Sequence, residues 1–189
     1  MKFKLVMICL AILLPAAAFS QGLQFGAGIQ TSLLNYNQRE LSTNKLFWGG
    51  HARIRAMKYL AGEVSLQRRE DVFSVHHGQI DLQTTPLQFS AIVYPLANFQ
   101  VSPYFLAGTG WYFLTATVTG DLGLPYVTGN GTITHTETAA HIGIGAEAFV
   151  GNHFSFGGDV RKIFLTFNTS IINYKFDAYF VNIGGTFYF

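Results

Sequence analysis

The sequence predicts an all-β protein, an eight-stranded antiparallel up-and-down transmembrane β-barrel. Apolar and polar residues alternate with a period of two in eight successive segments, which is typical of strands with two different faces. The connections between these segments alternate between short turns and long polar loops. Charged residues make up only 12% of the chain against 49% hydrophobic residues, about half the charged fraction of an ordinary soluble domain.

Residues 1–20 precede the first segment and have the composition of an export signal. A short basic start is followed by an apolar stretch over 5–14, a helix breaker at Pro15 and small residues at the junction. This order predicts a secretory signal peptide that is cleaved before Gln21, leaving a barrel domain over 21–189. The apolar stretch is much shorter than the roughly 20 residues that a membrane-spanning helix needs.

The exported part has no net charge and no thiol. The excess of two basic residues comes from Lys2 and Lys4, and the one cysteine is Cys9, so all three lie in the leader. A disulfide framework is therefore excluded, and a nucleic-acid partner is not expected. The most apolar later segment, 89–97, is interrupted by Pro95, so only a closed β-barrel would let this chain span a bilayer.

The first four segments show the alternation in the N-terminal half. In 22–33, Leu, Phe, Ala and Ile occupy one face, whereas Gln, Gly and Ser occupy the other. Segment 48–57 sets Trp, Ala and Ile against His and Arg, and segment 60–67 sets Leu and Val against Glu, Ser and Gln. Segment 80–94 alternates most clearly after Pro86. Because proline cannot donate a ladder hydrogen bond, we expect a bulge or register break there.

The last four segments continue the pattern. Segment 103–114 is nearly all apolar, and we place Phe105 and Trp111 outward because its glycines then face inward, like those of the first segment. Segment 140–150 alternates Ala and Ile with His, Gly and Glu. The seventh segment, from Phe154, sets Phe and Val against Ser, Asp and Arg, and the eighth runs to the C-terminus with Tyr, Val, Ile and Phe on one side.

The connections and the charged residues set the orientation of the sheet. Short turns are expected at 57–59, 95–102 and 151–153, and long loops at 34–47, 68–79, 115–139 and 165–175. Charged strand residues share the face that carries glycine and glutamine, and glycine relieves crowding inside a narrow barrel. Apolar residues should therefore face lipid, unlike the outer surface of a soluble lipocalin-like barrel. The apolar part of the last loop is expected to continue the strands beyond the bilayer.

Aromatic residues lie near both predicted ends of the strands. Trp48 and Trp111 fall at the long-loop end. The short-turn end carries Tyr59, Tyr94, Tyr104, Phe154 and Phe189. Two belts of aromatic rings would mark the two membrane interfaces.

The candidate site is a charge network on the inward face. Its residues are Arg53, Arg55, Glu63, His141, Glu147, Asp159 and Arg161. The tight turn near residue 58 places Arg55 opposite or diagonal to Glu63, within reach of an ion pair. Three cations and three carboxylates would neutralise one another, since a buried unpaired charge costs several kcal/mol. This arrangement predicts an ionic plug that fills the lumen, with a gated polar pathway for small solutes as the alternative.

Catalytic and metal-binding patterns are weak. Arg161 lies beside Glu147 and Asp159 and should keep both ionised, so neither suits a general acid. His135 and His141 would be about 20 Å apart along a strand, at roughly 3.3 Å per residue, and could not share one ion. We therefore expect no metal, no cofactor and no enzymatic activity.

The C-terminal residues NIGGTFYF resemble the assembly signal of bacterial outer-membrane proteins. Its characteristic positions are Asn182, Gly184, Phe187 and Phe189. Segments 103–114 and 141–162 resemble the small outer-membrane β-barrel domain family that includes OmpX-like and OmpW-like proteins. The resemblance implies that the barrel-assembly machinery reads the signal, and that the protein lies in the outer membrane of a Gram-negative bacterium, surrounded by its lipid.

Three functions remain open. The first is a structural or surface-interaction barrel with a plugged lumen, whose long loops meet an extracellular partner. The second is a conduit for small or hydrophobic molecules, which an apolar lumen opening toward lipid would favour. The third is a lipid-modifying enzyme, because some eight-stranded outer-membrane barrels are deacylases or acyltransferases. The deacylases use a neighbouring His and Ser on a lipid-facing strand, and the sequence offers no such pair.

Overall fold

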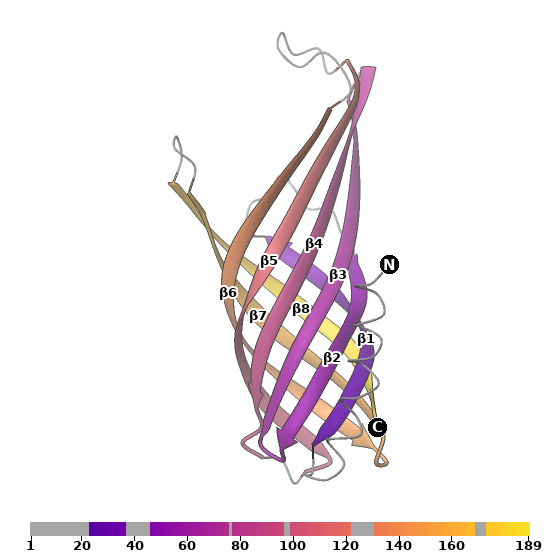
Figure 1. Cartoon of the computed structure of the whole chain (residues 1–189), viewed down its shortest axis with the longest axis vertical. Helices are drawn as coiled ribbons and strands as arrows, with labels where there is room; N and C mark the ends of the chain where they lie inside the picture. Colours follow the sequence, from indigo (N-terminus) through magenta and orange to yellow (C-terminus); the bar gives the residue numbers. More distant parts are fainter. Residues whose placement is uncertain (1–22, 37–45, 76, 97–98, 122–130, 169–172) are drawn as a thin grey trace, which may run out of the picture.

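A computed structural model describes residues 23–36, 46–75, 77–96, 99–121, 131–168 and 173–189. Eight antiparallel strands form one closed barrel in the order β1 to β8, as the sequence predicts (Figure 1). The strands are β1 Gln24–Tyr36, β2 Leu46–Met57, β3 Leu60–Val75, β4 His77–Val93, β5 Val101–Asp121, β6 Gly131–Val150, β7 Phe154–Asn168 and β8 Asn173–Tyr188. The expected leader, residues 1–20, lies outside the described residues.

The described part of the chain contains no helix that is long and apolar enough to cross a membrane.

The predicted facing of the strands is confirmed. In β5, whose facing the composition left ambiguous, Phe105 and Trp111 are 60% and 40% exposed, whereas Gly110 is buried. In β8, Ile183 is exposed and Asn182 is buried. Apolar side chains therefore cover the outside of the barrel, and the polar and charged side chains of the strands point inward, the pattern that lipid requires.

Strands are longer than predicted, and the long-loop boundaries were wrong. β3 runs to Val75 and pairs with β4 down to Gly78, so most of the expected loop 68–79 is strand. The β5–β6 pairing likewise continues to Val118 opposite Gly131. These extensions carry Thr, Val and Phe, which suit strands, together with polar residues on both faces, which is why their composition resembles a loop.

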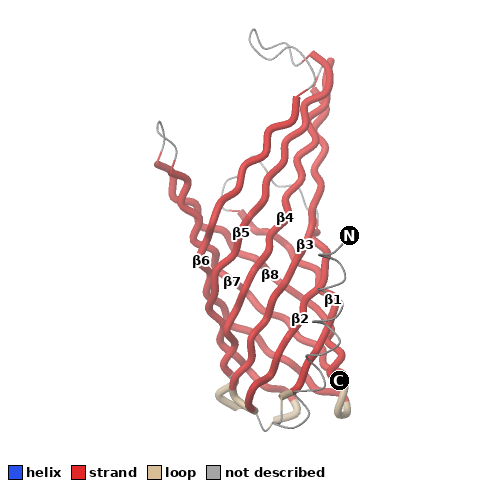
Figure 2. The backbone as a smooth tube through the Cα atoms, viewed as in Figure 1, coloured by secondary structure: helices blue, strands red, loops and turns tan. Residues whose placement is uncertain are grey.

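The extensions form a sheet that rises above the barrel (Figures 1 and 2). β2 pairs with β3 only as far as Arg68, and β7 pairs with β6 only from Ala139. Beyond these points the four strands β3 to β6 continue without β2 or β7. We call residues 69–75, 77–84, 115–121 and 131–138 the projecting sheet.

Pro86 does not shift the register, contrary to the prediction. The β3–β4 ladder pairs Leu66 with Leu87 and resumes with Arg69 opposite Thr84, which is the same register. Proline lacks the N–H donor, so pairing is interrupted locally while the strands stay aligned. The register shift of this region lies instead in β2, between Arg55 and Met57.

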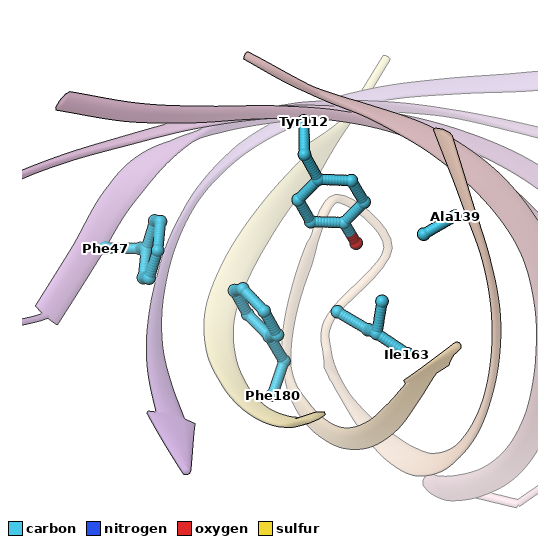
Figure 3. Close-up of a cluster of buried hydrophobic side chains, with 5 residues drawn as sticks. All are labelled: Phe47, Tyr112, Ala139, Ile163 and Phe180. Carbon is cyan, nitrogen blue, oxygen red and sulfur yellow. The ribbon is translucent and has the colours of Figure 1, made fainter. Parts of the chain in front are cut away.

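Two apolar clusters flank the polar centre of the lumen. The cluster toward the long-loop end comprises Phe47, Tyr112, Ala139, Ile163 and Phe180 (Figure 3). The cluster toward the short turns comprises Ala61, Ile92, Tyr94, Tyr104 and Leu106. Inward glycines make room between them: a Cβ atom on Gly108 would lie 1.9 Å from the Phe89 carbonyl oxygen and 2.8 Å from the His141 ring.

Candidate functional site

The centre of the lumen holds a continuous chain of five charged side chains. Its order is Glu147, Arg53, Glu63, Arg161, Asp159. Arg53 contacts Glu147 at 3.0 Å and Glu63 at 2.5 Å. Arg161 contacts the other Glu63 oxygen at 2.8 Å and Asp159 at 2.7 Å. Each side chain is at most 7% exposed, so water contributes little to solvating these charges.

Two of these ion pairs cross the barrel. Glu63 lies on β3 and Arg161 on β7, while Arg53 lies on β2 and Glu147 on β6. In a closed ring of eight strands, β3 and β7 stand opposite each other, as do β2 and β6. Both pairs therefore connect opposite walls, which is possible because an eight-stranded interior is about as wide as its own side chains.

Tyrosines complete the coordination of the outer carboxylates. Tyr94 and Tyr188 donate hydrogen bonds to Glu147 at 2.6 and 2.9 Å, and Tyr104 donates to Asp159 at 3.1 Å. The predicted lipid-facing belt positions of Tyr94 and Tyr104 are therefore wrong, because both are at most 3% exposed. The two-residue alternation could have placed Tyr94 correctly, since Ser90, Ile92 and Tyr94 follow one another at a two-residue spacing on the inward face.

Arg55 does not pair with Glu63 as predicted. The hairpin register sets Arg53 opposite Glu63 and Arg55 opposite Ala61, so Arg55 is diagonal to Glu63 as predicted but the ion pair goes to Arg53. The Arg55 guanidinium instead lies over two rings, 4.5 Å from the centre of Tyr94 and 4.6 Å from that of Phe149. Cation–π contacts of this kind stabilise a guanidinium in a site with little water.

His141 lies beside the network without joining its ion pairs. Its Nε2 is 2.9 Å from the Ser90 hydroxyl oxygen, and Arg161 donates to that same oxygen at 3.5 Å. Its Nδ1 has no hydrogen-bond partner among the described residues. The Ser90–His141 pair faces the lumen and is buried, at 6% and 1% exposed.

Very little space remains around the charges. The hollow lined by Arg53, Tyr104, Glu147 and Asp159 has a volume of about 20 Å³. A single water needs roughly 10–15 Å³ measured in this way. This hollow therefore has room for little more than one water beside the buried charges.

Another buried ion pair lies closer to the long-loop end of the barrel, and the sequence analysis did not predict it. Arg69 contacts Asp71 at 2.7 Å on the inward face of β3, and its guanidinium is 5.4 Å from the Phe47 ring centre. Both residues fall in the stretch that was predicted to be a loop. The two-residue alternation could have predicted the pair, because Gln67, Arg69 and Asp71 lie on the same inward face of β3 as Glu63.

The four residues of the expected assembly signal lie on both faces of β8. Asn182 faces the lumen and donates to Asp159 at 2.6 Å, and a Cβ atom on Gly184 would lie 2.7 Å from the Ile29 carbonyl oxygen. Phe187 and Phe189 face outward and stack edge to face at 5.3 Å. The Phe189 N–H donates to the Phe25 carbonyl at 2.8 Å, next to the seam where β8 pairs with β1.

No group of three or more His, Cys, Asp or Glu residues in the described ranges is arranged to hold a metal ion.

The chain belongs to the outer membrane protein beta-barrel domain family, which it matches over residues 6–189. It is thus a protein of the bacterial outer membrane. No curated protein matches its sequence.

Solved structures share the fold at low sequence identity. A major outer membrane protein from Thermus thermophilus is 9% identical, with a TM-score of 0.65, over 88% of this chain and 99% of that one. The N-terminal β-barrel domain of Pseudomonas aeruginosa OprF is 14% identical, with a TM-score of 0.56, over 87% and 97%. Ail, the attachment invasion locus protein of Yersinia pestis, is 14% identical, with a TM-score of 0.56, over 88% and 97%.

Proposed function

We propose that this protein is a non-enzymatic outer-membrane barrel with a plugged lumen that presents the projecting sheet as an interaction surface. The observation that carries the plug is the chain of ion pairs joining opposite walls, with only about 20 Å³ of space beside it. Moving a solute through this layer would require separating buried pairs such as Glu63–Arg161, which costs several kcal/mol. The barrel is therefore a rigid support rather than a pore.

The same network argues against the conduit. A conduit for hydrophobic molecules would need an apolar lumen, whereas the centre of this lumen is ionic. The apolar cluster around Phe47 and Phe180 lies at the long-loop end and is itself well packed, with ring centres 5.1 Å apart.

Catalysis has a similarly poor basis. The Ser90–His141 pair has the residue types of a hydrolase, but both residues face the lumen, where a membrane lipid does not reach them. No described carboxylate contacts the Nδ1 atom of His141 to orient the ring as a base. These features support a non-enzymatic role.

Recordings from planar bilayers test the plug. The refolded wild-type protein should give no steady single-channel steps in about 1 M salt, because buried pairs are little screened by salt. A large porin reconstituted in the same way serves as the positive control. Steady unitary steps from the wild-type protein would contradict the plugged barrel.

The projecting sheet supports the interaction role. In the described residues, β6 has no partner strand beyond Ala139, so residues 131–138 present one edge of backbone donors and acceptors. Such an edge can accept an added strand from a partner. We propose an extracellular protein partner that binds here. Replacing Thr134 with proline should abolish that binding while leaving the barrel folded, as judged by heat-modifiable gel mobility.

The C-terminal residues support recognition by the barrel-assembly machinery. Phe189 is 60% exposed beside the seam where β8 pairs with β1, so its ring is accessible to another protein even in the closed barrel. Deleting Phe189 should lower the yield of folded barrel in cells severalfold, while the purified variant refolds in detergent. Normal cellular yield would contradict this role.

A further inference from the structure

The lipid-facing wall carries a hollow that the plugged-barrel role does not use. It crosses β8, β1, β2, β3 and β4 and has a volume of about 830 Å³. Its walls are the outward side chains Ile29, Trp48, Leu66 and Ile183, which are 78%, 70%, 52% and 64% exposed. Its floor includes the outward glycines Gly50 and Gly185. We call it the outer groove.

The floor residue Gly185 is not required to be glycine by packing inside the barrel. A Cβ atom on the inward residue Gly28 would lie 2.1 Å from a carbonyl oxygen, so that position needs glycine. A Cβ atom on the outward residue Gly185 would be no closer than 3.4 Å to its neighbours, which is ordinary contact. Gly185 therefore creates space on the membrane side that the barrel itself does not need.

The outer groove is apolar along its walls and polar at one end. Arg68, Gln83 and Thr85 line that end, next to the interruption of the β3–β4 ladder at Pro86. Arg68 is opposite Trp48 in the register, and its side chain is 51% exposed. The polar end thus points toward the long loops, which face outward from the cell in barrels of this type.

The Arg68 side chain has donors available for an anion. It forms an ion pair with Glu70 and donates to Gln83 at 3.2 Å, and both contacts use Nη2. A guanidinium has five N–H donors, and no described residue contacts Nε or Nη1, so these two groups can bind a phosphate. Glu70 lies farther along β3 and does not line the outer groove.

We propose that the outer groove binds one phosphorylated glycolipid of the outer leaflet, with an acyl chain between Ile29 and Trp48 and a phosphate on Arg68. The groove lies on the surface that faces hydrocarbon, so its occupant is an amphiphile, and the single polar end sets the orientation of that amphiphile. Arginine binds phosphate with paired N–H donors at such an interface.

Native mass spectrometry of the full barrel in detergent, with diphosphorylated lipid A added, tests the site. The wild-type protein should retain one lipid A. The Gly185→Leu variant, which fills the floor, should bind at least tenfold more weakly. Gly62→Leu is the matched control, because Gly62 also faces outward, has no atom within 4 Å of its Cβ position and lies outside the groove. It should bind like the wild-type protein.

Two further variants distinguish the contribution of the lipid's acyl chain to binding from that of its phosphate. Ile29→Ala removes an exposed wall without a packing cost inside the barrel, and should weaken binding severalfold even if Gly185→Leu folds poorly. Arg68→Gln should remove the preference for diphosphorylated over dephosphorylated lipid A. Heat-modifiable gel mobility verifies that each variant is folded.

Several results would overturn the proposal. These are equal retention of lipid by Gly185→Leu and the wild-type protein, equal loss in Gly62→Leu, and an unchanged phosphate preference in Arg68→Gln. Displacement of lipid A by an equal concentration of phosphatidylglycerol would also overturn it. A wild-type dimer without lipid, which becomes a monomer in the Gly185→Leu variant, would overturn it as well. The occupant of the outer groove would then be a second copy of the protein.

Discussion

Strand β3 carries ion pairs of the same chemistry in opposite surroundings. Glu63 pairs with Arg53 and Arg161 inside the barrel, where its side chain is 0% exposed. Glu70, seven residues farther along the same strand, pairs with Arg68 at the base of the projecting sheet, where the two side chains are 59% and 51% exposed. Inside the barrel, the guanidinium groups of Arg53 and Arg161 take the place of water around the Glu63 carboxylate. The Arg68–Glu70 pair stays hydrated.

The two regions therefore differ in what their residues must satisfy. In the lumen every charge of the five-membered chain has a partner, because an unpaired buried charge would destabilise the fold. In the β6 part of the projecting sheet, residues 131–136 are exposed on both faces. One strand can thus serve as a wall of a packed interior and as part of a surface.

Removing the shared carboxylate should have the largest effect. Glu63→Gln leaves Arg53 and Arg161 without the charge that joins them, and should lower the free energy of unfolding by about 3–5 kcal/mol. Reversible urea unfolding in lipid vesicles measures this loss. Glu70→Gln is the matched control and should cost at most about 1 kcal/mol. Equal losses in the two variants would remove the distinction between the inner and outer pairs.

Adding a methyl group should also affect stability differently in the two regions. Gly108→Ala brings a methyl group to 1.9 Å from a backbone oxygen, so it should destabilise the barrel by about 1–3 kcal/mol. In the projecting sheet, Gly131 has no atom within 4 Å of its Cβ position. Gly131→Ala should therefore change the free energy of unfolding by less than about 0.5 kcal/mol. A tolerant Gly108 would show that the lumen is loosely packed.

Shortening the projecting sheet should have the smallest effect on stability. Thr117 pairs with Thr132, so residues 118–131 can be replaced by an Asn-Gly turn that joins them. The shortened barrel should unfold within about 0.5 kcal/mol of the wild-type protein in the same urea assay. A larger loss would mean that the extension supports the barrel rather than being displayed by it.

The facing of the barrel strands could be predicted because lipid imposes a strict period of two. The ends of the strands could not, because the extensions leave lipid and lose the apolar face. Arg69 and Asp71 keep their inward parity there, but Glu70 and Gln83 on the outward face look like loop residues. For the ends of the strands, amino-acid composition was therefore a worse predictor than the two-residue alternation.

The members of the charge network could be predicted, but their partners could not. All seven residues face the lumen or lie beside it, and Arg55 is diagonal to Glu63 as predicted, yet Arg53 stands directly opposite Glu63 and forms the ion pair instead. The Glu63–Arg161 contact joins residues 98 positions apart. It depends on strand tilt and stagger around the whole ring, which no local pattern encodes.

A double-mutant cycle between Glu63 and Arg161 tests the central claim that ion pairs tie opposite walls of the lumen together. Glu63→Gln, Arg161→Gln and the double variant are unfolded by urea in lipid vesicles, and their free energies of unfolding are compared with that of the wild-type protein. Because the two side chains are 2.8 Å apart and buried, we predict a coupling energy above about 1 kcal/mol. Losses that add to within about 0.3 kcal/mol would contradict the account.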